Sequence, residues 1–202
     1  MTHNFNFGSE NWFGHETSFF QILHDQIGKP NLTFLEMGCW KGKSSVWLLE
    51  NVLTHPTSTL FCVDVWDIHK WNPEAEETQT LWQNVSRQNE LDCENIYNIF
   101  LHNIRPYKNK CTIIKDYTQN ALNKFIQQKL QFDFIYIDAD HSTDPLKNDF
   151  KLSLQCIKKD GYIFLDDLSW NSVKKAIEEL SEELGISFNI ADENGVYYKE
   201  QN

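Results

Sequence analysis

Four aspartates follow two apolar segments of the chain. Asp138 and Asp140 come after FDFIYI, and Asp166 and Asp167 come after GYIFL. If these segments are adjacent parallel strands, all four residues lie at one carboxyl edge of a sheet, where open α/β sheets bind ligands. Carboxylates gathered there repel one another unless a proton or a cation intervenes. Because hard divalent cations take oxygen ligands, the pattern indicates a metal beside a cofactor site.

The elements that would position these aspartates alternate along the chain. Short apolar segments of strand character are typical of parallel strands covered on both faces, and they occupy residues 32–37, 59–65, 111–115, 132–138 and 161–167. Helical patterns fill the gaps and begin at Ser44 or Ser45, at Thr118 or Gln119, at an Asp144 cap before Pro145, and at Asn171 or Ser172. The last helix closes at Gly185, and the terminal segment ISFNIADENGVYYKE predicts two strands around an Asn-Gly turn. The sequence therefore predicts one domain over residues 1–202 with a doubly wound, Rossmann-like α/β sheet.

Two segments depart from this alternation. Residues 1–31 form an N-terminal extension with the helix candidate HETSFFQILHDQI, and residues 66–110 form a long insertion. The insertion is polar and rich in Trp at first, then helical from Ile96 to Ile104, and it ends near Pro106. A long insertion at the ligand edge often becomes a lid or a substrate wall. For its second half, an extra packing layer is an equally good interpretation.

The loop after the first strand has the composition of a ligand-binding turn. Glu36 is followed by Gly38, Gly42 and Ser44 and then by a helix, whose N-terminus offers free N–H groups. Trp40 stands where a dinucleotide-binding G-x-G-x-x-G motif would have its second glycine, which argues against a nicotinamide enzyme. A plain strand–helix turn is the simpler alternative.

Two further strand ends carry acidic residues. Asp64 closes the second strand, where a carboxylate can accept the hydroxyls of a ribose. Asp116, Tyr117 and Thr118 follow the third strand and would flank an adenine. Helix capping by Asp116 or Thr118 is an alternative, and both roles are compatible.

Composition limits the possible partners. The net charge is −11 with a pI near 5.0, which disfavours binding to a phosphate backbone. No run approaches the roughly 20 apolar residues of a membrane span, and the N-terminus lacks the pattern of a signal peptide, so we expect a cytoplasmic protein that binds no membrane. The five cysteines are widely spaced and form no C-x-x-C pair, so buried reduced thiols are expected.

Taken together, four motifs give the chain a family resemblance. LEMGCWKGKSS, FCVDVWD, IYIDADH and GYIFLDD occur in an order and spacing that resemble class I S-adenosylmethionine-dependent methyltransferases. The resemblance is to the small metal-dependent O-methyltransferases of the catechol, caffeoyl-CoA and macrolide or sugar type, over about residues 30–190. It implies a strand order of 3-2-1-4-5-7-6 with strand 7 antiparallel. It also implies Glu36, Gly38, Gly42 and Ser44 around the methionine part of the cofactor, Asp64 on the ribose and Asp116 near the adenine.

The same resemblance implies a metal and a base. Asp138, Asp166 and Asp167 match the family's metal ligands, and Mg²⁺ is the expected ion. The base would be Asp140, as in the macrolide and sugar enzymes, or His141, which stands where the catechol enzymes have a lysine. His141 could instead hydrogen-bond a metal carboxylate. Many related enzymes have acidic strand ends without a metal, in which case Asp166 would be a cap and Asp167 a loop charge.

The leading functional hypothesis is a Mg²⁺-assisted O-methyltransferase that acts on a small hydroxylated molecule such as a sugar, a polyketide or a phenolic. Alternatives are a methyltransferase for a nitrogen or a macromolecule, a non-catalytic S-adenosylmethionine-binding protein and a nicotinamide enzyme. The acidic composition speaks against nucleic acid as a partner. A homodimer is possible, because aromatic residues in the insertion would suit a subunit contact as well as a substrate wall.

Overall fold

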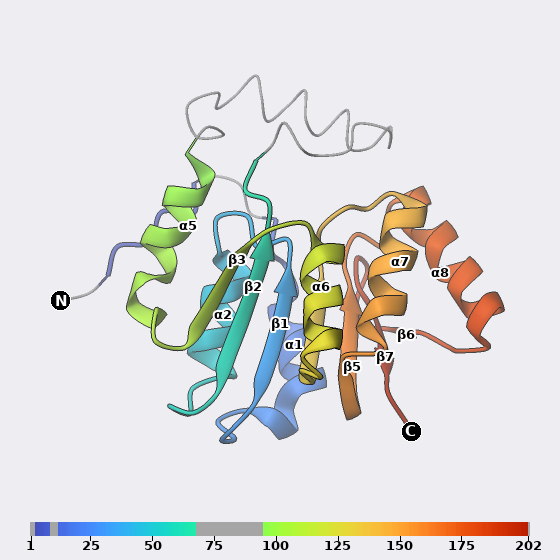
Figure 1. Ribbon diagram of the computed structural model, residues 1–202, viewed down its shortest axis with the longest axis horizontal. Coiled ribbons are helices and arrows are strands. Elements are labelled where there is room, and N and C mark those ends of the chain that lie inside the picture. The colour runs from blue at the N-terminus through green and yellow to red at the C-terminus, as the bar shows by residue number, and fades with distance from the viewer. Residues whose placement is uncertain (1–2, 9–11, 68–94, 202) are drawn as a thin grey trace.

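The protein is built on one seven-stranded sheet (Figure 1). A computed structural model describes residues 3–8, 12–67 and 95–201 of the chain. The strands are β1 (Thr33–Met37), β2 (Thr59–Asp64), β3 (Cys111–Lys115), β4 (Phe132–Ile137), β5 (Ile157–Leu165), β6 (Asn189–Ile190) and β7 (Val196–Lys199). Their order is β3-β2-β1-β4-β5-β7-β6, and β7 runs antiparallel to β5. The predicted fold class, strand order and antiparallel strand are therefore confirmed.

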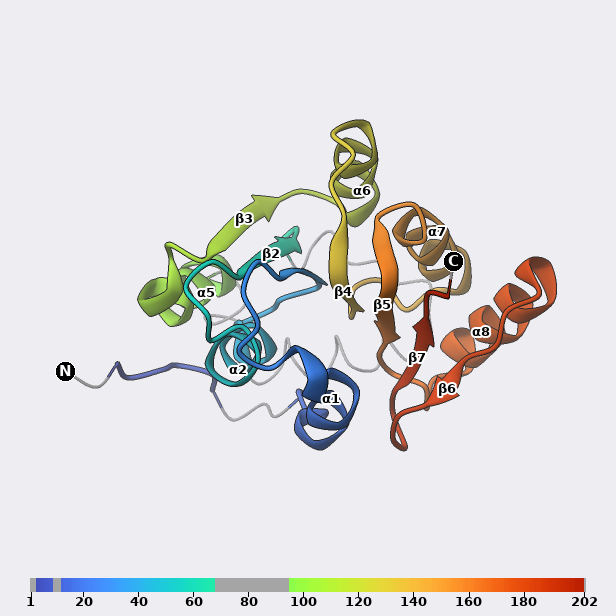
Figure 2. The same ribbon diagram turned by 90° about the horizontal axis from the view of Figure 1, so that it is seen from below.

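Helices cover both faces of the sheet (Figure 2). One face carries α1 (Glu16–Leu23), α2 (Lys43–Asn51) and α5 (Ile96–Ile104), and the other carries α6 (Thr118–Gln127), α7 (Thr143–Ser153) and α8 (Asn171–Leu184). Two layers of core result because alternate residues of a strand point to opposite faces. In β1, for example, Phe34 packs in the layer of α1, α2 and α5, whereas Leu35 packs in the layer of α6, α7 and α8. Continuous apolar strands are what such a two-sided sheet requires.

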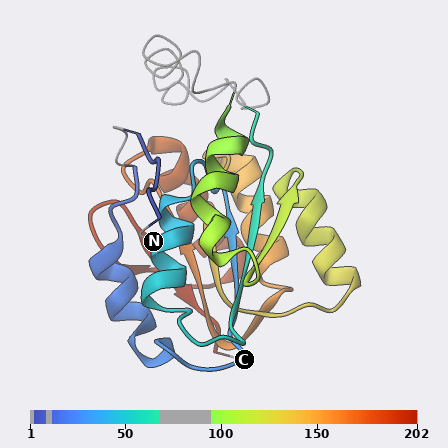
Figure 3. The same cartoon turned by 90° about the vertical axis from the view of Figure 1, so that its left-hand side faces the viewer.

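The segments outside the simple alternation belong to the first helical layer. The predicted helix over residues 15–27 is present as α1 followed by the short 3₁₀ helix η1 (His24–Gln26). The helical half of the insertion is α5, which lies beside α2 (Figure 3) and ends in the 3₁₀ helix η3 (Arg105–Tyr107). Phe100 of α5 is fully buried and packs against Trp66 with ring centroids 4.6 Å apart. This half is an extra packing layer, and the expected lid at its polar start lies outside the described residues.

Two element boundaries differ from the sequence prediction. Helix α7 has Ser142 as its N-cap residue, so Asp144 lies in the first turn and is not the cap. An acidic residue in the first turn still interacts favourably with the helix dipole. Strand β5 begins at Ile157 rather than at Gly161, and its start is irregular because the β4–β5 register shifts between Phe132 and Phe134. Within the described part of the chain, no helix is long and apolar enough to cross a membrane.

The strand register brings the ends of the three central strands together. Met37, Ile137 and Leu165 are aligned in neighbouring strands, so the residues after them also lie side by side. The amide of Asp138 donates to Met37 O at 2.8 Å, and the amide of Asp166 donates to Ile137 O at 3.1 Å. The sheet therefore places the acidic turn after β4 between the end of β1 and the acidic turn after β5.

Candidate active site

A cavity of about 450 Å³ opens at the carboxyl edge of the sheet. Its size falls within the usual range for small-molecule sites. The described residues that line it come from the turns after β1, β2, β3, β4 and β5, from the N-terminal segment and from the loop before β7: Trp12, Gly38, Trp40, Asp64, Val65, Asp116, Tyr117, Thr118, Asp138, Ala139, Asp140, His141, Asp166, Asp167, Trp170 and Asn194. Of the predicted site residues, Glu36, Gly42 and Ser44 are not among the lining residues.

Glu36 lies beneath the β1–α2 loop instead of facing the cavity. Its side chain is fully buried, and its two carboxylate oxygens accept hydrogen bonds from the hydroxyls of Ser44 and Ser45. Burial raises the pKa of Glu36 to about 7, although the two serine hydroxyls oppose the rise. Glu36 and Ser44 thus fasten the start of α2 to β1, and contact with a cofactor stays a prediction for both.

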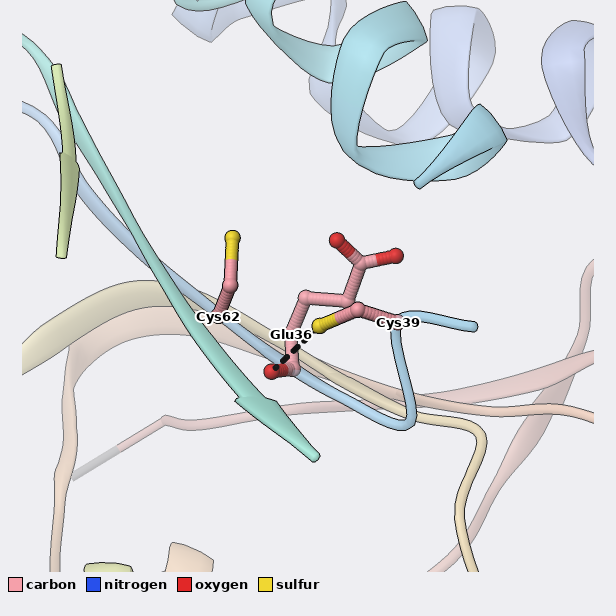
Figure 4. Close-up of side chains that lie close together, drawn as sticks. All are labelled: Glu36, Cys39 and Cys62. Carbon is pink, nitrogen blue, oxygen red and sulfur yellow. Dashed lines mark hydrogen bonds between the residues drawn. The ribbon is translucent and has the colours of Figure 1, made fainter. Parts of the chain in front are cut away.

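Glu36 also lies near two buried thiols, Cys39 and Cys62 (Figure 4). One ligand atom from each of the three residues lies within 4.8 Å of the other two, so the cluster resembles a metal site in spacing as well as in composition. Cys39 Sγ donates to the carbonyl oxygens of Glu36 and Val63 at 3.6 and 3.7 Å. Burial raises the pKa of both thiols well above the ordinary value, whereas metal binding requires the thiolate. These cysteines are buried reduced thiols, as expected from the sequence.

The glycines of this loop are required by the protein's own packing. Gly38 has a φ of +85°, and a Cβ there would lie 1.7 Å from the carbonyl oxygen of Asp138. Gly42 has a φ of +81° and precedes α2, with a Cβ position 3.0 Å from the ring of Phe100. Gly38 also lines the cavity, so a ligand in the cavity could contact its backbone.

Asp64 organises the loop above β2 and lines the cavity. Its Oδ2 accepts the amides of Cys39 and Trp40 at 2.8 and 2.9 Å, and its Oδ1 accepts the amide of Trp66 at 2.6 Å. Burial raises the pKa of Asp64, and these backbone donors oppose the rise. The amide of Val65 is a fourth backbone donor to Asp64, and a carboxylate has about four lone-pair sites, so the contact with a ribose hydroxyl stays a prediction.

Asp116 lies at the far end of the cavity, beside Tyr117 and Thr118. It forms an ion pair with Lys124 at 2.8 Å, and the hydrogen bond from Lys124 is the main reason that its pKa is lowered. Its Oδ1 accepts the amide of Tyr117 at 2.9 Å. The N-cap position of α6 belongs to Tyr117, so neither Asp116 nor Thr118 occupies it. Tyr117 is half exposed, and its ring forms part of the cavity wall.

The structure brings Asp138, Asp167 and His141 together. His141 Nε2 lies 3.5 Å from Asp138 Oδ1 and 3.2 Å from Asp167 Oδ2. One ligand atom from each of the three residues lies within 4.8 Å of the other two. Burial and then the charges of Asp166 and Asp167 raise the pKa of Asp138, which is the mutual repulsion expected of clustered carboxylates. A bound cation would relieve that repulsion.

Asp166, the third predicted metal ligand, lines the cavity and has several protein partners. Its Oδ1 contacts His15 Nε2 at 2.8 Å and accepts the amide of Asp167 at 2.6 Å, and its Oδ2 accepts the hydroxyl of Tyr136. The side chain is almost fully buried. The oxygens of Asp166 thus have protein partners at the cavity wall, and coordination of a metal stays a prediction for this residue.

His15 is a buried part of this site that the sequence did not reveal. Its ring lies between Asp166 and Asp192, with both nitrogen–oxygen distances at 2.8 Å. Burial lowers the pKa of His15, but the two carboxylates more than compensate and raise it to about 9. His15 directly precedes α1, and a single histidine beside a helix start carries no sequence signal for this role.

Asn194 is a second residue that sequence reasoning missed. Its side-chain amide donates to Asp167 Oδ1 at 3.1 Å from the loop between β6 and β7. Asp167 itself has a φ of +58°, a conformation that costs energy and is common at functional sites. The Asn-Gly turn was predicted as a hairpin only, yet it also holds the acidic turn after β5.

Asp140 lines the cavity and accepts one hydrogen bond from the described part of the chain. Its Oδ1 accepts the amide of Ser142 at 2.9 Å, which fixes the carboxylate at the entrance to α7. The second oxygen has no hydrogen-bond partner among the described residues. Of the two predicted bases, Asp140 thus lies on the same cavity wall as the cluster of Asp138, His141 and Asp167, and His141 is part of that cluster.

The residues of this edge fit a divalent cation and a nucleoside-containing cofactor. Asp138 and Asp167 supply carboxylate oxygens and His141 supplies an imidazole nitrogen, all of which are metal ligands in proteins. Asp64 and Asp116 follow the neighbouring strands of the same edge. An α/β sheet of this order with such an edge defines the class of doubly wound enzymes that bind a small cofactor at the strand ends.

Comparison with known proteins identifies the family. Residues 35–168 match the family described as a methyltransferase domain, so the chain belongs to that family. The protein is an S-adenosylmethionine-dependent methyltransferase, as the sequence motifs predicted. A search of curated proteins finds no match.

Several solved structures share the fold at low sequence identity. The calicheamicin methyltransferase CalS11 has 10% identity and a TM-score of 0.61, over 91% of this chain and 76% of that one. The O-methyltransferase from Bacillus cereus in complex with SAH has 15% identity and a TM-score of 0.60, over 94% and 82%. An rRNA methylase from Streptococcus thermophilus has 10% identity and a TM-score of 0.53, over 96% and 100%. The shared fold thus serves different acceptors.

Proposed function

We propose that the protein transfers the methyl group of S-adenosylmethionine to a hydroxyl of a small molecule, assisted by a divalent cation. The observation that carries this proposal is the continuity of one cavity, which is lined by the cofactor candidates Asp64 and Asp116 and by the cluster of Asp138, His141 and Asp167. A cofactor and an acceptor held in one cavity can react without diffusing together, which supplies much of the rate of a transfer reaction.

The residues of the cavity have separate tasks in this proposal. Asp64 would accept the ribose hydroxyls, and Tyr117 would cover the adenine. Asp140 would remove the proton of the acceptor hydroxyl, because its carboxylate lies on the cavity wall and is fixed only through Oδ1 among the described contacts. A bound divalent cation lowers the pKa of a coordinated hydroxyl, and Asp138, His141 and Asp167 are the residues that would hold it. Mg²⁺ is the ion that the carboxylates alone would favour.

The cavity wall also favours a class of acceptor. Trp12 and Trp40 pack together with ring centroids 4.9 Å apart, and Trp170 adds a third indole beside His141. Among the described lining residues, the formal charges come from aspartates, with His141 as the one group that can become a cation. Flat apolar walls and negative charge favour a neutral, ring-shaped hydroxylated acceptor, such as a phenolic or a sugar, over a phosphorylated one.

The acidic character of the whole protein argues in the same direction. A net charge of −11 repels a phosphate backbone, so we infer that nucleic acid is not the acceptor, although an rRNA methylase shares the fold. Methylation of an RNA transcript in preference to small phenols would contradict this inference.

The first test is thermal unfolding with S-adenosylhomocysteine, NAD or neither, each with Mg²⁺ or EDTA. Saturation at 100 times the dissociation constant adds roughly 2.7 kcal/mol, which is on the order of 5 °C in the midpoint for a domain of this size. We expect S-adenosylhomocysteine to raise the midpoint and NAD to leave it unchanged. Mg²⁺ should raise the midpoint further than EDTA does. A shift with NAD alone would contradict the proposal.

The second test is catalytic. Asp140→Asn should lower kcat on hydroxylated acceptors by about 10²–10⁴-fold, because general-base catalysis contributes that much. Ser142→Ala is the matched control, since it changes the same turn but keeps the carboxylate and the backbone amide that it accepts. Equal activity of the Asp140→Asn variant and the control would remove Asp140 from the mechanism.

A further inference from the structure

The geometry of the cluster of Asp138, His141 and Asp167 indicates which of its atoms could bind a metal. This step rests on the proposed function only in assuming that the cavity holds a divalent cation. His141 turns its Nε2 toward the carboxylates, 3.2 Å from Asp167 Oδ2 and 3.5 Å from Asp138 Oδ1. The side chain of His141 is mostly buried, and its ring packs against Trp170 with centroids 4.8 Å apart, so its orientation is set by packing.

The spacing of these three atoms matches the spacing of atoms around one small cation. With bonds of about 2.1 Å, neighbouring ligands are about 3.0 Å apart in an octahedron and about 3.4 Å apart in a tetrahedron. The two measured separations from His141 Nε2 are close to these edges. His141 therefore needs little rearrangement to coordinate a metal together with Asp138 and Asp167.

Asp166 is poorly suited to join this set. Its Oδ1 contacts His15 and the amide of Asp167, and its Oδ2 accepts the hydroxyl of Tyr136. Coordination without rotation would have to use the remaining lone pair of Oδ2, and any rotation of the carboxylate would disturb its buried contact with His15. Asp166 is better placed to fix the turn that carries Asp167 through that amide hydrogen bond.

We propose that His141 is a first-row transition-metal ligand, and that Asp138, His141 and Asp167 form the coordinating set. Carboxylate-only sites suit Mg²⁺ and Mn²⁺, whereas imidazole suits Fe²⁺, Ni²⁺, Cu²⁺ and Zn²⁺. The site then selects a transition ion over Mg²⁺, and Asp166 acts as a positioning residue. Commitment of His141 to the metal leaves Asp140 as the base.

The test uses Mn²⁺ as the probe on the full-length protein, followed by electron paramagnetic resonance. We expect bound Mn²⁺ to show magnetic coupling to a ¹⁴N nucleus of a coordinated imidazole. The coupling should disappear in His141→Asp and persist in Asp140→Asn, which changes the adjacent residue but leaves the ligand set intact. Competition between Zn²⁺ and Mg²⁺ should show that His141→Asp lowers the preference for Zn²⁺ on the order of tenfold.

Several results would overturn the inference. They are a wild-type protein that binds no Mn²⁺, bound Mn²⁺ without nitrogen coupling, and coupling that survives in His141→Asp. If His141→Asp does not fold, the wild-type and His15→Gln spectra together decide the test, because coupling that persists in His15→Gln excludes that second histidine. His15→Gln supplies a second control, because loss of coupling there with retention in His141→Asp would identify the wrong histidine.

Failure of this inference and failure of the proposed function give different results. The same samples are titrated with S-adenosylhomocysteine and followed by thermal unfolding. Cofactor binding together with nitrogen-free Mn²⁺ would remove His141 from the ligand set and leave methyl transfer in place. Nitrogen-coupled Mn²⁺ without any response to S-adenosylhomocysteine would support the metal site and contradict the proposed function.

Discussion

At the scale of single residues, Glu36 shows how an acid can be kept in a core. Its carboxylate is fully buried beneath the β1–α2 loop and is held by two serine hydroxyls. Burial disfavours the ionised form, and the pKa rises from 4.5 to about 7. Between these two pH values the folded protein keeps a proton that the unfolded chain has lost.

A pH dependence of stability follows from Glu36. The stabilisation is complete below pH 4.5 and is lost as the pH rises to about 7, because the folded state binds more protons in that window. The shift corresponds to about 3 kcal/mol in the free energy of unfolding. Glu36→Gln should remove this part of the decline, as measured by denaturant unfolding at pH 5, 6 and 7. An identical pH slope in the variant would show that Glu36 is ionised in the fold.

Asp64 carries a second residue-level prediction. Asp64→Asn removes the charge but keeps one oxygen for the amides of Cys39 and Trp40. We expect S-adenosylhomocysteine to bind about 10- to 100-fold more weakly, since hydrogen bonds to a charged group contribute about 1.5–3 kcal/mol. Titration calorimetry measures this, with Mn²⁺ affinity as the internal control. An equal loss of metal affinity would mean that the whole loop has moved and that Asp64 has no separate ribose role.

At the scale of elements, two glycines have left-handed φ values for different reasons. Gly185 ends α8 with a φ of +65°, and a Cβ there would meet nothing within 4 Å. Gly38 ends β1 with a φ of +85°, and a Cβ there would collide with the backbone of Asp138. The first glycine is needed for its backbone conformation alone, and the second is also needed for the close approach of β1 and β4.

These two positions form a matched pair for mutation. Gly185→Ala should lower the free energy of unfolding by about 1–2 kcal/mol, which is the cost of a left-handed L-residue. Gly38→Ala should cost distinctly more, because the strand end must move as well. Denaturant unfolding of both variants provides the comparison. Equal costs would show that the β1–β4 contact relaxes freely.

Element-level signals also explain how much of this structure the sequence predicts. Apolar segments and their acidic ends are local patterns, so the strands and the edge with Asp138 and Asp167 could be predicted from the sequence. The order of the strands was predicted from the family resemblance. The orientation of Asp166 could not be, because it depends on His15, which is 151 residues away in sequence. The role of Asn194 likewise depends on β7 pairing with β5, a contact that no local pattern encodes.

At the scale of the whole molecule, one contact joins a segment near the N-terminus to a segment near the C-terminus. His15, from the N-terminal extension, bridges Asp166 after β5 and Asp192 before β7. Ser18 of α1 also donates to Asp192, so the contact involves more than one residue of the extension. The extension and the C-terminal hairpin are thereby joined to each other through the acidic turn.

Breaking this contact should destabilise the entire fold. His15→Gln leaves buried carboxylates without their partner, and we expect a loss of about 3–5 kcal/mol in the free energy of unfolding. Asp192→Asn and the double variant complete a thermodynamic cycle that isolates the coupling. The exposed His24 serves as a control, because His24→Gln should change stability by less than about 0.5 kcal/mol. Additive effects of the two single variants would show that His15 and Asp192 do not act together.

The contact of His15 with Asp166 and Asp192 has a practical consequence for the choice of expression boundaries. The recognisable family segment covers residues 35–168, whereas His15, Asp192 and Asn194 all lie outside it. A fragment trimmed to that segment would retain every aspartate of the acidic edge and lose the partners that orient two of them. The smallest piece able to behave as the enzyme is therefore larger than the part that sequence similarity outlines.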